Sequence, residues 1–238
     1  MLEILKSLLI AFFAVAVLLP VVRYALRRLS PVGEEDALTA EEVKYMQKKE
    51  LKLTIVYFFF ACVLSVFSAG LLAILSSIIH ASKEHLHVLT PNFRALFAPG
   101  LLLGLTLAII PLRLVQGTLL GQEQELYRRY MNRLEGRNSN RMYNMLLAVM
   151  LLVSGVIAWH AMRWHVDIDE NRIEITNLLL EHRSYTMQEI ESIHYLGAEG
   201  EYLVSFTDKT NFNTTYLKPV QLEMIALLAE ESGHRVIR

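Results

Sequence analysis

The chain has 238 residues, 53% of them hydrophobic, and a formal net charge of -1. Soluble domains are typically about 45–50% apolar, so this composition excludes an ordinary soluble protein and favours a membrane protein. The charge is unevenly distributed, because residues 164–238 carry 13 acidic and 6 basic side chains and residues 1–163 carry 11 and 17. The acidic carboxy-terminal region argues against nucleic acid as a partner, since nucleic acid selects basic surfaces.

Four long apolar runs divide the chain. They cover residues 7–22, 53–80, 95–112 and 143–162. A helix needs about 20 apolar residues to cross the hydrocarbon core of a bilayer, so we expect four transmembrane helices in a domain formed by residues 1–163. The first run is interpreted as a retained span and not as a cleaved signal, because the arginines that follow it are typical of a segment that stops transfer.

Lys and Arg residues flank these runs unequally. The connections after the first and third runs contain thirteen: Arg23, Arg27, Arg28, Lys44, Lys48, Lys49, Lys52, Arg113, Arg128, Arg129, Arg133, Arg137 and Arg141. The other ends of the runs have four, namely Lys6, Lys83, Arg94 and Arg163. Because cytoplasmic connections are enriched in Lys and Arg, we predict that both termini lie outside the cytoplasm.

The second and third helices are predicted to extend beyond the bilayer. Thr39–Glu42 has the pattern of a capping box, and no Gly or Pro follows before Lys52. The second helix is therefore expected to begin near residue 40 and to run for about 40 residues. The third is expected to continue through Gln122–Leu134 until Gly136, so that two antiparallel helices protrude.

Small side chains recur at every fourth position of the second run and again in the third. They are Ala61, Ser65, Ala69, Ala73 and Ser77 in the second, and Gly100, Gly104 and Ala108 in the third. Such spacing lets two helix backbones approach closely in a bilayer. We therefore expect these two helices to form a tight central pair, with Pro99 and Pro111 bending the third near its ends.

After Trp164 the pattern changes to short runs in which apolar and polar residues alternate. This period of two predicts strands near residues 165–168, 172–177, 178–185, 190–195, 201–207 and 211–217. A final helix is expected to open with Pro219 in its first turn and to end before Gly233. Residues 164–238 are therefore predicted to form a small α+β domain that folds by itself.

The order of six antiparallel strands closed by an amphipathic helix, behind a membrane hairpin, resembles the bacterial pleckstrin-homology-like (PH-like) membrane proteins. The likeness is carried by Ile173–Ile175, Tyr185–Ile193, Tyr202–Asp208 and the helix from Pro219 to Ser232. A full PH barrel has one strand more than the six predicted. The Lys/Arg cluster that would bind phosphoinositides is absent from these residues, so the resemblance implies a protein-interaction or assembly domain.

The predicted topology places the histidines on one side of the membrane. His85 and His87, with Glu84, could provide imidazole and carboxylate ligands for a metal, joined across the bundle by His160 or His165. Against this site, no HExxH motif occurs, and His near a span end often only marks the headgroup region. The metal site is one hypothesis, and an interfacial role for these residues is the other.

No catalytic motif is evident, because charged groups are missing from the centres of the runs and no GxSxG or phosphate-binding loop occurs. The leading hypothesis is a non-enzymatic multi-pass membrane protein that anchors a PH-like interaction domain and needs no cofactor. The alternatives are a small transporter or metal-handling protein that uses the outer histidines, and a membrane-embedded hydrolase. We expect membrane lipids as partners, together with a protein or a second copy of the chain that pairs with an exposed strand edge, for instance Asn211–Leu217.

Overall fold

The computed structural model describes residues 2–29, 38–81, 85–135, 139–197 and 200–238. The chain divides into two compact units. Residues 1–68 and 100–155 form the first, which we name the helical unit, and residues 69–99 and 156–238 form the second, which we name the β-unit.

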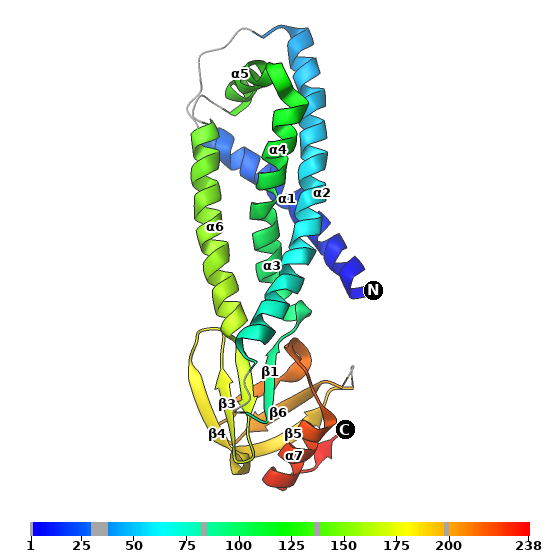
Figure 1. The fold of residues 1–238 in the computed structure, drawn as a ribbon, viewed down its shortest axis with the longest axis vertical. Coiled ribbons are helices and arrows are strands. Elements are labelled where there is room, and N and C mark those ends of the chain that lie inside the picture. The colour runs from blue at the N-terminus through cyan, green and yellow to red at the C-terminus, as the bar shows by residue number, and fades with distance from the viewer. Residues whose placement is uncertain (1, 30–37, 82–84, 136–138, 198–199) are drawn as a thin grey trace. The chain divides into compact units, whose positions relative to one another are not determined.

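Within the described residues, four helical segments are long and apolar enough to cross a membrane, which confirms the predicted runs as helices. Figure 1 shows α1 (Leu2–Leu29), α2 (Ala40–Ile79), α3 (Phe93–Leu107), α4 (Ile109–Leu120), α5 (Gln124–Glu135) and α6 (Ser139–Arg163). Membrane crossing itself remains a prediction from length and composition.

Helix α2 begins where the capping box predicted. The Thr39 backbone N–H donates to Glu42 Oε2 at 2.8 Å, and the Glu42 N–H donates to Thr39 Oγ1 at 3.3 Å. The two residues thus satisfy N–H groups that a helix start leaves without partners. The helix then runs for 40 residues, as expected.

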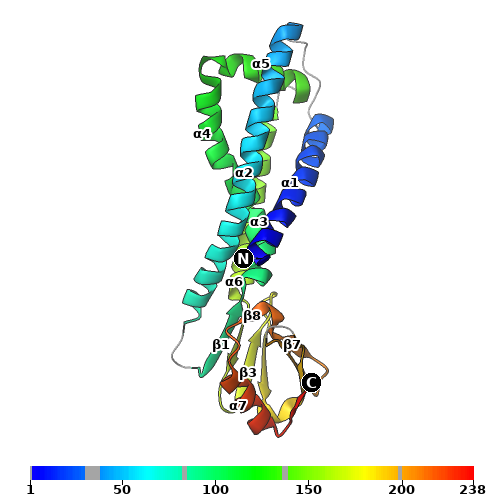
Figure 2. The same ribbon diagram turned by 90° about the vertical axis from the view of Figure 1, so that its right-hand side faces the viewer.

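The third apolar run does not form one continuous helix. Helix α3 ends at Leu107 and α4 begins at Ile109, because Pro111 has no N–H to donate to the Leu107 carbonyl. A second break follows at Gly121, where φ is 48°, a value that glycine adopts at no steric cost. The predicted helix near Gln122–Leu134 is present as α5, but the expected continuation of the third helix is wrong, since α5 turns sideways from α4 after this glycine (Figure 2).

In the helical unit, α2 and α3 make the close contact that their small residues predicted. Ala61 and Ala108 are fully buried in a cluster with Val15 and Leu105. Ser65 is also fully buried, and its hydroxyl donates to the Ala61 carbonyl at 2.6 Å, which satisfies it within its own helix.

The β-unit contains two sheets in the part of the chain that the structure describes. The five-stranded sheet has the order β4-β3-β2-β1-β8, and the four-stranded sheet has the order β7-β6-β5-β9. Their strands are β1 (His87–Pro91), β2 (His165–Ile168), β3 (Arg172–Thr176), β4 (His182–Thr186), β5 (Ile190–Tyr195), β6 (Tyr202–Phe206), β7 (Asn211–Asn213), β8 (Leu217–Lys218) and β9 (Val236–Ile237).

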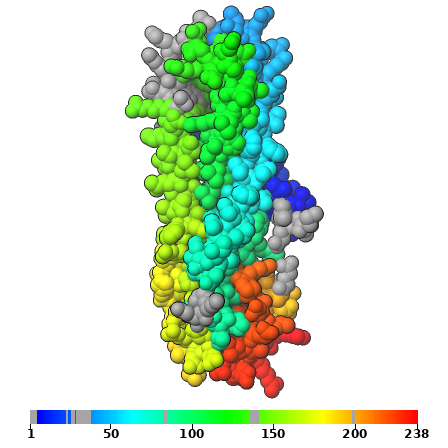
Figure 3. All heavy atoms as spheres, in the orientation of Figure 1, coloured from blue at the N-terminus to red at the C-terminus, as the bar shows by residue number. Residues whose placement is uncertain are grey.

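Strand β1 comes from the connection between α2 and α3, where no strand was predicted. It lies between β2 and β8, with Leu89 opposite Val166 and Thr90 opposite Lys218. Figures 1 and 3 show this neighbourhood, where the blue-green β1 region lies between yellow and orange segments of the unit. Residues 164–238 are thus not the whole of the sheet region, because helices α3–α6 are inserted in the chain between β1 and β2.

Apolar residues from both sheets and from α7 (Leu222–Ser232) form one core. Leu89, Ile193, Phe206 and Leu228 are among its fully buried members. The ring of Phe206 stacks on Tyr185 with centroids 4.0 Å apart. Helix α7 begins three residues after the predicted Pro219 and ends at Gly233, whose φ of 70° suits a glycine cap.

The ends of the apolar helices are joined to this core by hydrogen bonds within the β-unit. Ser76 near the end of α2 donates to the Met162 carbonyl of α6 at 2.8 Å. The Ser77 and Thr90 hydroxyls lie 3.1 Å apart, which connects α2 to β1. These contacts orient the strands relative to the helix ends that enter the unit.

Candidate functional site

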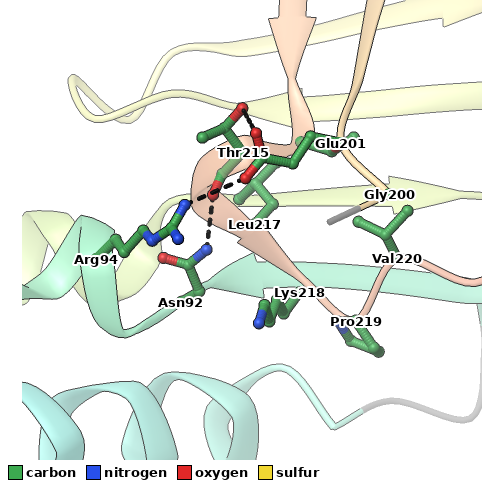
Figure 4. Close-up of a pocket in the computed structure, with 10 residues that line it drawn as sticks. Asn92, Arg94, Gly200, Glu201, Thr215, Leu217, Lys218, Pro219 and Val220 are labelled. Atoms are coloured by element: carbon green, nitrogen blue, oxygen red, sulfur yellow. Dashed lines mark hydrogen bonds and ion pairs between the residues drawn. The ribbon is translucent and has the colours of Figure 1, made fainter. Parts of the chain in front are cut away.

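A polar pocket of about 260 Å³ lies where β1 continues into α3. Asn92 occupies this corner and is 8% exposed. Its Oδ1 accepts from the Ala95 N–H at 3.1 Å, which caps the start of α3, and its Nδ2 donates to the Thr215 carbonyl at 2.8 Å. One side chain therefore joins α3 to the segment between β7 and β8 (Figure 4).

Arg94 and Glu201 face each other across the same pocket. An Arg94 guanidinium nitrogen lies 3.2 Å from Glu201 Oε1, and the Thr215 hydroxyl donates to Glu201 Oε2 at 3.0 Å. Figure 4 shows the three side chains converging from α3, from the start of β6 and from the β7–β8 connection. Both carboxylate oxygens thus have partners.

This arrangement is suited to holding segments together. The described lining residues include no Cys or His, and their one carboxylate is paired with a cation. The pocket is a polar clamp that fixes the start of α3 against the β-unit.

Two histidines stack on each other where α2 ends and β2 begins. The rings of His80 and His165 have centroids 4.1 Å apart. Each Nδ1 is bonded to a backbone carbonyl, that of Ser76 at 2.8 Å for His80 and that of Arg163 at 2.7 Å for His165. Because a carbonyl oxygen can only accept a hydrogen bond, Nδ1 of each ring carries a proton, and these bonds do not fix whether Nε2 carries one.

The environments of the two rings shift their pKa values in opposite directions. Burial lowers the pKa of His80 because it disfavours the charged ring. Burial acts on His165 as well, but its bonds to Asp167 and to the Arg163 carbonyl raise its pKa overall. His165 therefore takes up a proton at higher pH than His80 does.

The residues of the predicted metal site are not brought together as a group. His85 Nδ1 lies 3.1 Å from both oxygens of Asp169, at the β2–β3 turn, whereas His160 Nδ1 lies 3.3 Å from the Leu178 carbonyl, at the β3–β4 turn. These two turns are at opposite ends of β3, a five-residue strand about 13 Å long.

The other two members of that predicted site lie elsewhere or outside the described residues. His87 is the first residue of β1, opposite Ile168 of β2. Glu84 lies outside the described residues. In the described ranges, no group of three or more His, Cys, Asp and Glu side chains is arranged to hold a metal ion.

Sequence reasoning missed two surface features of the five-stranded sheet. Strand β4 is one of its two edge strands, the other being β8, and Ser184 in the middle of β4 is exposed. The turn that precedes β4 presents Leu178 and Leu179 to the outside. The run of three leucines was visible in the sequence, but it was assigned to a strand.

No family model, curated protein or solved structure matches this chain. Its function is therefore argued from its own residues.

Proposed function

We propose that this chain is a non-enzymatic, multi-pass membrane protein of the bacterial inner membrane whose β-unit is a PH-like interaction or assembly domain. The four apolar helices anchor the domain, and the open edge at β4 pairs with an extended segment of a protein partner or of a second copy. The observation that carries the proposal is that β4 is an edge strand and that four of its five residues are exposed.

The strand order supports the PH-like assignment. With β1 included, β1–β4 lie in one sheet and β5–β7 lie in the other, and α7 packs on the shared core. The connection before α3 thus supplies the strand that the sequence resemblance lacked. Strands β8 and β9 have two residues each and extend the two sheets.

The charge pattern supports placing this domain outside the cytoplasm. Thirteen Lys and Arg residues flank the opposite ends of the apolar runs, whereas the region 164–238 is acidic. An acidic surface also suits partners that present cations, since complementary charge speeds association.

The hydrogen-bond register identifies which backbone groups of β4 are available. The Asn177 N–H donates to the Glu181 carbonyl at 3.1 Å and the Met187 N–H donates to the Asn171 carbonyl at 3.4 Å. Antiparallel pairs alternate between bonded and non-bonded, so Arg183 and Tyr185 bond to β3 while the N–H and C=O of Ser184 point away from it. A partner strand would bond to Ser184.

The strand edge predicted from the sequence, Asn211–Leu217, is only partly open. β7 is the edge of the four-stranded sheet, but Leu217 and Lys218 pair with β1, so that the stretch Asn211–Leu217 does not form one free edge. β7 has three residues and β4 has five, which favours β4 because a longer ladder forms more bonds.

Photo-crosslinking in native membranes tests the proposal. A photoreactive amino acid in place of Arg183 should capture one defined product, and the product should persist in Ser184→Ala. It should disappear in Ser184→Pro, because proline removes the outward N–H while the bonds to β3 remain. Equal product in Ser184→Pro and Ser184→Ala, at equal melting temperatures, would exclude pairing at this edge.

A further inference from the structure

We propose that the turn Asn177–Glu181, which we name the leucine turn, inserts its leucines into the headgroup region of the bilayer that α6 crosses. This inference rests on the proposed function, because it requires that α6 span a membrane. The β-unit would then be attached to the membrane in two ways, through the ends of its helices and through direct contact of the leucine turn with lipid.

The leucine turn exposes apolar side chains that a water-facing turn would not favour. Leu179 is 75% exposed and Leu178 is 51% exposed. Turns between strands usually carry Gly, Asn, Asp or Ser, which tolerate both water and the backbone geometry. Adjacent exposed leucines at a turn tip indicate an apolar or interfacial environment.

The turn is held rigidly in the shape that exposes them. Asn177 Oδ1 accepts from the Leu179 N–H at 2.8 Å and from the Glu181 N–H at 3.0 Å, and its Nδ2 donates to Glu181 Oε2 at 2.8 Å. The Leu180 N–H donates to the Asn177 carbonyl at 3.0 Å, with Leu180 at a φ of 62°. The leucines are therefore presented outward before any contact with lipid is made.

A hydrogen bond between α6 and the leucine turn fixes the position of the turn along the axis of α6, close to the end of this helix. His160, one turn before the end of α6, is bonded through Nδ1 to the Leu178 carbonyl at 3.3 Å. Figure 1 shows the yellow β3–β4 connection beside the end of α6. The leucine turn thus lies next to the last turn of the span, within the same unit of the fold.

The neighbouring residues of α6 are those of a membrane interface. The Arg163 guanidinium lies over the Trp159 ring, 4.5 Å from its centroid, and Trp159 is exposed. Trp and Arg at the end of a span mark the headgroup level, where an amphipathic ring and a cation both find partners. A turn joined to His160 shares that level, so lipid is the occupant that this geometry fits.

Fluorescence quenching in vesicles tests the inference on the full chain. In a Cys62→Ala background, single cysteines replace Leu179, Glu189 and Val149 and carry an environment-sensitive nitrobenzoxadiazole label. The vesicles contain phosphatidylcholine and phosphatidylglycerol, with or without a lipid that carries a nitroxide near its headgroup. Glu189 is the exposed control beyond the other end of β4, and Val149 is the exposed control within α6.

The label at Leu179 should emit at shorter wavelength than the label at Glu189, should be quenched several-fold more by the nitroxide lipid, and should be protected from aqueous iodide. If the labels at Leu179 and Glu189 are quenched equally by iodide while Val149 is quenched by the lipid, the leucine turn is in water and the inference fails, although the spans stand. If Val149 is also quenched by iodide, the proposed membrane anchoring fails as well. A blue-shifted Leu179 label that neither quencher reaches would show burial against protein, which also overturns the inference.

Discussion

Gly104 of α3 faces the backbone of Ser65 in α2, at a separation that admits no side chain. A Cβ on Gly104 would lie 2.3 Å from the Ser65 nitrogen and 2.4 Å from the Ser65 Cα. Both are backbone atoms, so a rotamer change cannot relieve the clash. The small-residue pattern of the two helices thus has a direct structural cause.

Gly104→Ala is therefore expected to destabilise the protein in detergent by about 1–3 kcal/mol, the usual effect of an added group in a close-packed site. Gly155→Ala is the matched control, because Gly155 lies in α6 and has nothing within 4 Å of its Cβ position. Unfolding by a graded denaturing detergent measures both. Equal stability of the two variants would rule out close contact between α2 and α3.

Asn92→Ala is expected to lower the free energy of unfolding by about 1–2 kcal/mol, because it removes the cap of α3 and the hydrogen bond to the Thr215 carbonyl at a buried position. Asn211→Ala, at an exposed position of β7, should have a small effect. Thermal unfolding of the full chain followed by fluorescence compares them. A cost at Asn92 no larger than that at Asn211 would contradict the role of the polar clamp.

The His85–Asp169 pair should make stability depend on pH. The hydrogen bond to Asp169 raises the pKa of His85, with further support from the charges of Asp167 and Glu174. A group whose pKa is higher in the folded than in the unfolded chain stabilises the fold. This stabilisation is complete at pH values below the unfolded pKa of about 6.5, and it is lost as the pH rises through the folded pKa.

The difference in melting temperature between the wild type and His85→Gln should therefore be largest near pH 6 and should shrink by about pH 8. Because both side chains are partly exposed, the contribution of the pair to the free energy of unfolding should stay below about 1 kcal/mol. Comparing the two proteins cancels the titration of other groups. A difference that grows with rising pH would show that His85 is stabilised as the neutral ring.

The charge asymmetry predicts the orientation of the chain. A reporter that is active only in the cytoplasm should work when fused after Asn138 and fail when fused after Arg238. A reporter active only outside the cytoplasm, fused at the same two positions, serves as the converse control. Activity of the cytoplasmic reporter at Arg238 alone would reverse the orientation and move the β-unit inside.

Local patterns in the sequence predicted the elements that depend on local interactions. The apolar runs became helices, Thr39 and Glu42 formed the expected cap, and Gly233 ended the last helix. Most strands after Trp164 lie within one or two residues of their predicted bounds, since alternation of apolar and polar residues is a property of the strand itself.

Features set by distant pairing were not predictable in this way. β1 is five residues long and has Leu89 in the core only because β2 and β8 lie on either side of it. Leu178 and Leu179 were assigned to a strand because they are apolar, but the Asn177 side chain bonds to the N–H groups that follow and forms a turn. The separation of His85 from His160 likewise depends on the course of β3.

Completion of the β-unit by β1 is tested most directly by comparing two soluble proteins, residues 164–238 alone and residues 85–92 joined to residues 164–238 by a flexible linker. Leu89 is fully buried, and without β1 strand β2 pairs only with β3 while β8 loses its neighbour in the sheet. The same comparison tests the expectation that residues 164–238 fold by themselves.

Thermal unfolding followed by circular dichroism is the measurement. The linked protein should melt cooperatively, and residues 164–238 alone should show no cooperative transition or one at a clearly lower temperature. Leu89→Asp in the linked protein should abolish the increase in melting temperature over residues 164–238 alone, since it places a charge in the core. Cooperative melting of residues 164–238 alone at the same temperature as the linked protein would contradict a domain that is completed by β1.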